Sequence, residues 1–305
     1  TSPLISIVPR PTQIVPGSGN FTFSAKTAFA VENQEQAAIA RNFIDLFTRA
    51  AGITPALNVG SKEGQIRFVT DFSFKTEAYL LEITPQQILI KASDTKGFFY
   101  ALQSVRQLLP ATIESEQPVQ NIAWSVPAMT VRDEPRFGFR GLLLDPVRCF
   151  IPKENVLRII DCMAMLKINK LHFHLTDDNG WRIEIKKYPR LTEIGSIRKE
   201  TGIGASRTEF DGKPYGGFYT QDEIREIVKY AQERYVTVIP EIDLPGHMLA
   251  ALAAYPELGC TGGPYEVACH WGVFPDVLCL GNEKTYEFLE GVLSEVIEPV
   301  SYTHL

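Results

Sequence analysis

The sequence lacks any long hydrophobic run, and no stretch approaches the roughly 20 uninterrupted apolar residues that cross a bilayer. It also lacks an excess of positive charge, because 30 Lys and Arg residues face 36 Asp and Glu residues, giving a net charge of −6. Binding nucleic-acid phosphates requires a basic surface, so the charge balance argues against a nucleic-acid partner. The 45% hydrophobic and 22% charged residues instead indicate a folded globular protein.

Metal-binding cysteine pairs are also missing. None of the five cysteines belongs to a C-x-x-C motif, and none has a His at a spacing suited to zinc. Cys162 lies in an apolar helical pattern, which predicts a buried free thiol. Cys260, Cys269 and Cys279 share one polar loop, so a disulfide between two of them remains an open alternative if the protein is exported.

The length of 305 residues exceeds that of a usual domain, roughly 100–200 residues, and predicts two domains. Residues 1–128 contain short β-rich runs punctuated by turn residues, together with two helical patterns. We therefore expect a non-catalytic α+β domain there, a sheet with helices on one face. The runs are 66–69, 79–83 and 87–91, and the helical patterns are 34–50 and 95–108.

Residues 129–305 follow another rhythm, in which apolar strands alternate with helices. This alternation predicts a parallel sheet covered on both faces, as in a barrel or a doubly wound fold. No G-x-G-x-x-G follows any strand, which weakens the dinucleotide-binding alternative. The predicted α/β architecture is the first three strand–helix units of an incomplete (β/α)8 TIM barrel. The strands are 139–145, 170–175 and 236–242, and the helices are 152–167, 220–234 and 283–298.

Each predicted barrel strand ends in polar residues, where the chemistry of a barrel belongs. One such residue is easily explained by a loop cap or a solvated surface charge. The same pattern at three consecutive strands favours a functional site. The residues are Asp145, Arg148, Asp177, Asp178, Glu241, Asp243 and His247.

The second strand adds two imidazoles, because His172, His174 and Thr176 alternate with Phe173 and Leu175. A polar face inside a barrel is costly unless its members pair, so we expect a hydrogen-bonded network there. A metal site built on the two His residues and a carboxylate is the rival hypothesis. A sugar-binding site accounts for more residues, because Arg148 offers a planar fork of donors and Trp181 an apolar face. We therefore expect neither metal nor cofactor.

Three motifs closely resemble barrel segments of family 20 glycoside hydrolases, the β-N-acetylhexosaminidases. The segment before residue 129 resembles the non-catalytic partner domain of that family. The likeness covers nearly the whole chain. The motifs are RGLLLD at 140–145, HFHLTDDNGWR at 172–182 and PEIDLPGH at 240–247.

The resemblance implies roles for individual residues. Arg148 corresponds to the arginine that grips the outer hydroxyls of the terminal N-acetyl sugar. Asp177 and His247 correspond to a pair that supports the catalytic acid. Apart from these correspondences, we expect Asp177, His247, Asp178 and Trp181 to bind the substrate together with Arg148. The implied mechanism is substrate-assisted: the acetamido oxygen attacks the anomeric carbon, an Asp steadies the acetamide and the adjacent Glu acts as acid and then base.

That Asp-Glu pair, normally preceded by Gly-Gly, is absent from the 305 residues. We therefore expect this chain to be inactive and poorly soluble by itself, and residues 300–305 to be foreign to the family. The expected parent protein removes terminal N-acetylglucosamine or N-acetylgalactosamine from glycans or chitooligosaccharides. The alternatives are a lacto-N-biosidase-like or chitobiase-like hydrolase, a catalytically silent carbohydrate-binding homologue and, weakest, a zinc hydrolase. We expect export to the periplasm, cell surface or medium, although no signal peptide is present.

Overall fold

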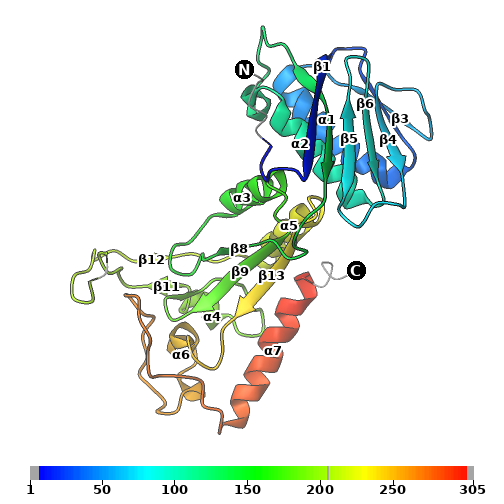
Figure 1. Ribbon diagram of the computed structural model, residues 1–305. Helices are drawn as coiled ribbons and strands as arrows, with labels where there is room; N and C mark the ends of the chain where they lie inside the picture. The colour runs from blue at the N-terminus through cyan, green and yellow to red at the C-terminus, as the bar shows by residue number, and fades with distance from the viewer. Residues whose placement is uncertain (1–6, 205, 301–305) are drawn as a thin grey trace. The chain divides into compact units, whose positions relative to one another are not determined.

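The computed structural model describes residues 7–204 and 206–300, which fold into two compact units (Figure 1). The first comprises Thr1–Arg140 with Ala164–Lys167, and the second Gly141–Met163 with Ile168–Leu305. The predicted boundary at residue 128 falls inside a strand of the first unit, whereas the main division follows Arg140. The foreign tail predicted at 300–305 lies outside the described residues, apart from the backbone of residue 300.

The first unit is built on a mixed seven-stranded sheet of order β1-β7-β5-β6-β4-β2-β3. The sequence predicted β4, β5 and β6 almost to the residue and missed the other four strands. Strand β1 was hidden because its side chains are mostly exposed and it contains Pro16, Gly17 and Gly19, so it lacks an apolar alternation. The strands are β1 (Gln13–Thr22), β2 (Ala28–Val31), β3 (Ala56–Val59), β4 (Ile66–Thr70), β5 (Tyr79–Ile83), β6 (Ile88–Ala92) and β7 (Ser125–Asp133).

Helices α1 (Gln34–Ala51) and α2 (Thr95–Leu108) pack on each other and on one face of this sheet (Figure 1), followed by the short η1 (Ala111–Glu114). Both begin at a capping side chain: Asn33 accepts a hydrogen bond from the backbone N–H of Gln36, and Asp94 from that of Gly97. The predicted sheet with helices on one face is therefore confirmed.

The second unit contains three parallel strands, β8 (Gly141–Leu144), β9 (Lys170–Asp177) and β13 (Thr237–Ile242), with β9 between the other two. The short β10 (Gly180–Trp181) folds back antiparallel onto the end of β9. Because the three strands are parallel and adjacent, their carboxyl ends meet at one edge of the sheet. The predicted strand–helix rhythm is confirmed as a partial barrel wall, and the described strands do not close into a barrel.

Three long helices follow the three strands: α3 (Lys153–Met165), α5 (Gln221–Gln232) and α7 (Glu283–Val300). Thr220 and Glu223 form a capping box at the start of α5. Helix α3 is shorter than predicted, because Lys167 adopts a left-handed conformation with φ of 60°. The remaining elements are α4 (Arg190–Glu193), β11 (Ile197–Arg198), β12 (Tyr215–Gly216), α6 (Leu249–Ala254) and η2 (Pro256–Leu258).

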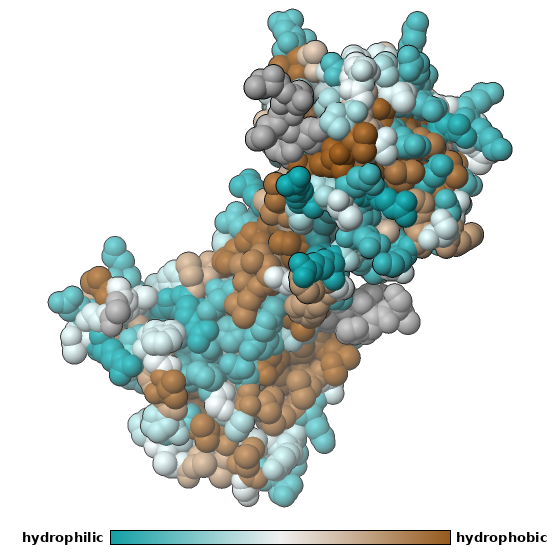
Figure 2. All heavy atoms as spheres, viewed as in Figure 1, coloured by the Kyte–Doolittle hydropathy of each residue, from teal (hydrophilic) through white to brown (hydrophobic). Residues whose placement is uncertain are grey.

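Hydrophobic side chains reach the surface over β8 and along α7 (Figure 2), where Leu143 is 56% and Ile297 62% exposed. Strand β8 pairs only with β9 among the described residues, so its outer edge is open. No described helix combines the length and apolar character needed to span a membrane.

All five cysteines are free in this structure. The prediction that Cys162 is buried is wrong: its side chain is exposed, on the outer side of α3. Of the three loop cysteines, Cys260 and Cys279 lie close enough to share a hydrogen bond, which raises the pKa of Cys260. An isolated antiparallel bridge between Gly259 and Leu278 holds their two segments together.

Candidate functional site

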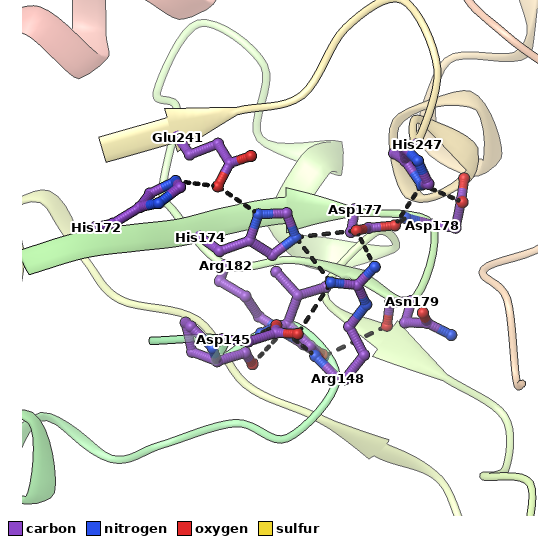
Figure 3. A network of polar contacts seen from close by, with 12 residues as sticks. Asp145, Arg148, His172, His174, Asp177, Asp178, Asn179, Arg182, Glu241 and His247 are labelled. Carbon is purple, nitrogen blue, oxygen red and sulfur yellow. Dashed lines mark hydrogen bonds and ion pairs between the residues drawn. The ribbon is translucent and has the colours of Figure 1, made fainter. Parts of the chain in front are cut away.

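The turn after β8 directs Arg148 back toward the strand ends. One carboxylate oxygen of Asp145 accepts hydrogen bonds from the backbone N–H groups of Val147 (3.0 Å) and Arg148 (3.1 Å). The other accepts from Nη1 of Arg148 at 2.9 Å, so one side chain fixes both the turn and the guanidinium (Figure 3). Arg148 Nε is buried and has no hydrogen-bond partner among the described residues.

Asp177, at the end of β9, is the centre of the network (Figure 3). Oδ2 pairs with Nη2 of Arg148 and lies 2.9 Å from Nε2 of His174, while Oδ1 lies 3.0 Å from Nδ1 of His247. Oδ1 also accepts the backbone N–H of Asp178 at 2.6 Å. A carboxylate that is only 2% exposed therefore faces three cationic or ionisable groups from three strand ends.

Glu241 of β13 links the two His residues of β9. Its Oε2 lies 2.5 Å from Nε2 of His172 and 2.9 Å from Nδ1 of His174. Glu241 also shares a side-chain hydrogen bond with Asp243, whose backbone N–H donates to Oγ1 of Thr176 at 3.1 Å. The two rows of polar side chains thus face each other across parallel strands, as the alternation on β9 predicted.

His247 follows β13 in a loop with an unusual backbone. Its φ of 55° lies in the left-handed region, which non-glycine residues seldom occupy, and such outliers cluster at functional sites. Its Nδ1 lies 3.0 Å from Oδ2 of Asp178, and the other oxygen of Asp178 accepts the backbone N–H of Leu249 at 3.2 Å. Asp178 therefore joins the loop to β9.

The network separates the proton affinities of its members. Burial opposes the charge of His174, but hydrogen bonds to Asp177 and Glu241 outweigh it and raise the His174 pKa to about 9. His174 is consequently protonated at neutral pH, and both of its ring nitrogens donate to carboxylates. For Asp177, burial is likewise outweighed by hydrogen bonds from His174 and the Asp178 backbone, which lower its pKa.

Both outer members of the network, Asp178 and His247, have raised pKa values. Burial, together with the neighbouring charge of Asp177, raises the pKa of Asp178. Burial disfavours protonation of His247, yet the charges of Asp177 and Asp178 prevail and raise the His247 pKa. A carboxylate held ionised beside an imidazole of raised proton affinity can stabilise a proton or a positive charge brought to this edge.

Two sets of residues have the ligand atoms and the proximity to hold a metal ion: His174 with Glu241 and Asp243, and Asp177 with Asp243 and His247. The same ring nitrogens and carboxylate oxygens form the ion pairs of the network, so an ion held by either set would displace those contacts. The chemistry of the donors therefore fits the ion-paired network better than a metal centre.

Two predicted substrate contacts need correction. Trp181 is fully buried, its indole N–H donates to the carbonyl of Ile183 at 2.7 Å, and its ring packs near Phe288. The prediction that Trp181 offers a face to a sugar is therefore wrong, because its apolar ring belongs to the core. Asp178 is 1% exposed. One of its oxygens contacts Nδ1 of His247 and the other accepts the backbone N–H of Leu249, so Asp178 positions the loop rather than touching a ligand.

Sequence reasoning also missed two buried arginines. Arg182 donates to the carbonyls of Pro146, Val147, Ser196 and Gly217, and so clamps the loop after β8. Arg198 donates to the carbonyl of Arg148 at 2.9 Å. Arg182 and Glu184 alternate with apolar residues, a pattern typical of solvent-facing charges, so nothing in the sequence signals that Arg182 is buried, and the sequence around Arg198 offers no signal either.

The segments that form these two units match two protein-family models. Residues 137–305 match the catalytic domain of glycosyl hydrolase family 20, and residues 4–134 match domain 2 of the same family. A β-hexosaminidase from Porphyromonas gingivalis is 41% identical over 99% of this chain and 38% of its own length. The N,N'-diacetylchitobiase of Vibrio harveyi is 40% identical over 59% of this chain and 20% of its own.

Solved structures give the same result. The N-acetyl-β-hexosaminidase of Streptomyces plicatus, in complex with Thio-NAglucal, superposes with a TM-score of 0.86 at 35% identity, covering 98% of this chain and 58% of that one. The chain spans less than half the length of the first two curated relatives, 38% and 48%. With one model matching 137–305 and its companion matching 4–134, the chain belongs to glycosyl hydrolase family 20.

Proposed function

We propose that the chain forms the front part of a β-N-acetylhexosaminidase that removes terminal, non-reducing β-linked N-acetylglucosamine or N-acetylgalactosamine. The observation that carries this proposal is the convergence of Arg148, Asp177 and His247 from three adjacent strand ends. The relatives include β-hexosaminidases and a chitobiase, which supports glycans or chitooligosaccharides with terminal N-acetylhexosamine as substrates.

In this proposal Arg148 holds the sugar. Its guanidinium is one-third exposed and is anchored on one side by Asp145 and Asp177, so its remaining N–H groups are oriented before a ligand arrives. A planar fork of donors suits two neighbouring hydroxyl oxygens. Preorganisation of this kind lowers the entropy lost on binding.

Asp177 and His247 act as positioning residues. The chemistry proposed is substrate-assisted and retaining: the acetamido oxygen attacks the anomeric carbon while an acid protonates the leaving oxygen, and water then opens the oxazolinium ion. The buried charge of Asp177, transmitted through His247, supports an acid at the same edge of the sheet. The raised pKa of His247 is consistent with a group that shares a proton with such an acid.

The acid itself is not among these residues, because no Asp-Glu dipeptide preceded by Gly-Gly occurs in the 305 residues. We therefore expect residues 1–305 alone to bind the sugar without cleaving a chromogenic N-acetylglucosaminide, and the longer gene product to cleave it. Turnover by residues 1–305 contradicts the assignment of the acid. Absence of turnover by a longer product that contains a Gly-Gly-Asp-Glu stretch contradicts the proposed activity.

A binding assay tests the role of Arg148 directly. Arg148→Ala removes the donors and should weaken N-acetylglucosamine binding about 10–100-fold, the effect of losing charge-assisted hydrogen bonds. Arg148→Lys keeps the charge but loses the fork, so it should recover only part of the affinity. Arg158→Ala is the matched control, because Arg158 is an exposed arginine on α3. Equal affinity in the Arg148 and Arg158 variants refutes the role of Arg148.

The second candidate is a catalytically silent carbohydrate-binding homologue, which would keep the sugar contact of Arg148. It predicts sugar binding without turnover in the longer gene product as well. Zinc analysis separates the remaining alternative, because stoichiometric zinc that survives dialysis favours a metal centre at His174. We also propose export, which fractionation of the native host tests.

A further inference from the structure

A cavity of about 290 Å³ opens beside the strand-end network, and Arg148 belongs to both. It lies within the second unit, between the loop that joins β11 to β12 and the segment before residue 272. Arginine and histidine supply all of its ionisable lining residues apart from one thiol, and no carboxylate lines it. The lining residues are Arg148, Asn179, Arg198, Thr201, Gly202, Gly204, Ser206, Arg207, Cys269, His270 and Trp271.

Of two neighbouring buried guanidinium groups, that of Arg198 lines the cavity and that of Arg182 lies behind the lining. Arg182 and Arg198 are 0% and 4% exposed, and neither forms an ion pair with a carboxylate among the described residues. Burial lowers the pKa of Arg182 to about 10, and the charge of Arg198 adds to the effect. A buried charge without a counter-ion is costly, so this region favours an incoming anion.

The carboxylates nearby do not remove this excess. Asp145 and Asp177 both pair with Arg148, on its strand-end side. Asp211 forms no ion pair with Arg198 among the described residues, and one of its oxygens accepts hydrogen bonds from the backbone N–H groups of Thr201 and Lys213. The charge near the cavity therefore stays positive.

The mouth of the cavity carries two groups suited to a polar ligand. Arg207 is exposed and has no hydrogen-bond or ion-pair partner in the described part of the chain. Trp271 is 74% exposed and offers an apolar wall of the kind against which sugar rings pack. Arg148 also lines the cavity, and its buried Nε has no hydrogen-bond partner among the described residues.

We propose that this cavity binds an anionic substituent, a sulfate or a carboxylate, of the glycan whose terminal sugar Arg148 holds. The inference rests on the proposed function and narrows its substrate class to anionic N-acetylhexosamine glycans. Arg207 is the specificity residue: it donates charge-assisted hydrogen bonds to the substituent, and Arg182 and Arg198 strengthen the field behind it. A neutral sugar has no group that binds in the cavity, so water fills it.

The test compares four probes by calorimetry at low salt: N-acetylglucosamine, its 6-sulfate, N-acetylmuramic acid and inorganic sulfate. We expect at least one anionic sugar to bind about 5–10-fold tighter than N-acetylglucosamine, as one exposed charge-assisted contact allows. Arg207→Ala should abolish this advantage and leave neutral-sugar affinity unchanged. Arg158→Ala, which removes an exposed charge on α3, should retain the advantage.

Three outcomes overturn the inference: no anionic sugar binds better than the neutral one, Arg207→Ala keeps the advantage, or inorganic sulfate alone binds as tightly as the anionic sugars. The last result reveals an adventitious ion only. A failure of N-acetylglucosamine itself to bind counts against the proposed function instead, so the two failures are distinguishable. High salt should reduce the anionic advantage, since screening weakens exposed charges.

Discussion

The two units of the molecule use their strands in different ways. In the first, β5 and β6 bury apolar side chains against helices whose aromatic rings pack together, and a buried amide such as Gln36 is satisfied by Glu32 and Thr70. In the second, β9 and β13 carry imidazoles and carboxylates to their ends. Both units have a buried apolar core, and the first also holds the buried ion pair of Lys167 with Asp133, but in the second the charged side chains gather at the ends of adjacent parallel strands.

This difference matters because buried charges cost free energy that buried rings do not. A network such as that around Asp177 often stabilises a fold no better than apolar residues of the same volume. Its presence at the end of three strands is therefore better explained by a ligand than by folding. We therefore assign a structural role to the first unit and the ligand-binding site to the second.

The largest expected effect tests the packing side of this comparison. Phe47 is fully buried, with its ring 4.8 Å from Phe23 and 5.6 Å from Trp124. Phe47→Ala should lower the free energy of unfolding of the first unit by about 3–5 kcal/mol through the cavity left behind. Phe72→Ala, which removes a ring that is 86% exposed, is the control and should stay within about 0.5 kcal/mol. Denaturant unfolding measures both, and equal effects contradict the packing argument.

A somewhat smaller effect is expected on the charged side. Asp177→Asn keeps the shape but leaves Arg148, His174 and His247 without their shared counter-ion. We expect a loss of about 2–3 kcal/mol, below the full cost of breaking a buried pair because the Arg148 and His247 side chains are about one-third exposed.

Sugar affinity distinguishes this variant from a merely destabilised one. Asp177→Asn should weaken N-acetylglucosamine binding at temperatures where the protein is still folded, whereas Phe47→Ala should not. Asp222→Asn, at a side chain that is 89% exposed on α5, is the matched control. If Asp177→Asn binds N-acetylglucosamine as tightly as the wild type, the claim that the second unit holds the sugar site through Asp177 is wrong.

The pH dependence of stability sharpens the comparison further. The folded pKa of His174, about 9, lies above its usual 6.5, so its stabilising contribution is complete below pH 6.5 and disappears as the pH rises through 9. The lowered pKa of Asp177 acts in the opposite range, and its contribution is lost as the pH falls below 3.8. His174→Gln should therefore cost stability at pH 6 and little at pH 10.

Thermal unfolding across this pH range, with His270→Gln alongside, provides the measurement. The His270 ring contacts the carbonyl of Trp271 and stacks on Phe274, and no carboxylate of the described residues pairs with it, so its replacement should not reproduce the alkaline loss. A stability difference between wild type and His174→Gln that is the same at pH 6 and pH 10 refutes the assignment.

The smallest expected effect concerns Cys260 and Cys279. Because they are hydrogen-bonded neighbours, an oxidising compartment should join them into a disulfide and leave Cys269 free. Mass spectrometry of exported protein before and after reduction detects the bridge. A bridge that involves Cys269 contradicts the pairing, and Cys269→Ser is the control that should leave it intact.

The fold was predictable wherever local patterns match the tertiary environment. Thr220 and Glu223 predicted the start of α5 because a capping box is a local device. Strand β1 escaped because the exposed residues and glycines between Pro16 and Asn20 erase its alternation. The polar strand ends were predictable as a set, because parallel strands bring their carboxyl ends together.

The failures share a physical cause. Trp181 has a chemical character that suits both a sugar platform and a core, and only its burial distinguishes the two. Arg198 drew no prediction, because the carbonyls that it binds belong to Asn179 and Arg148, 19 and 50 residues away. Contacts across such separations leave no periodicity in the sequence.

The shared carboxylate of Asp177 has a thermodynamic consequence. Its two oxygens contact different residues: Oδ2 pairs with Arg148, and Oδ1 pairs with His247. A sugar that draws Arg148 away from Oδ2 leaves more negative charge for His247, which should then take up a proton more readily. By reciprocity, sugar affinity must change with pH by the same factor by which the sugar changes the proton affinity of His247. The number of protons taken up when the sugar binds therefore reports this coupling. Calorimetry in buffers of different ionisation enthalpy measures that number.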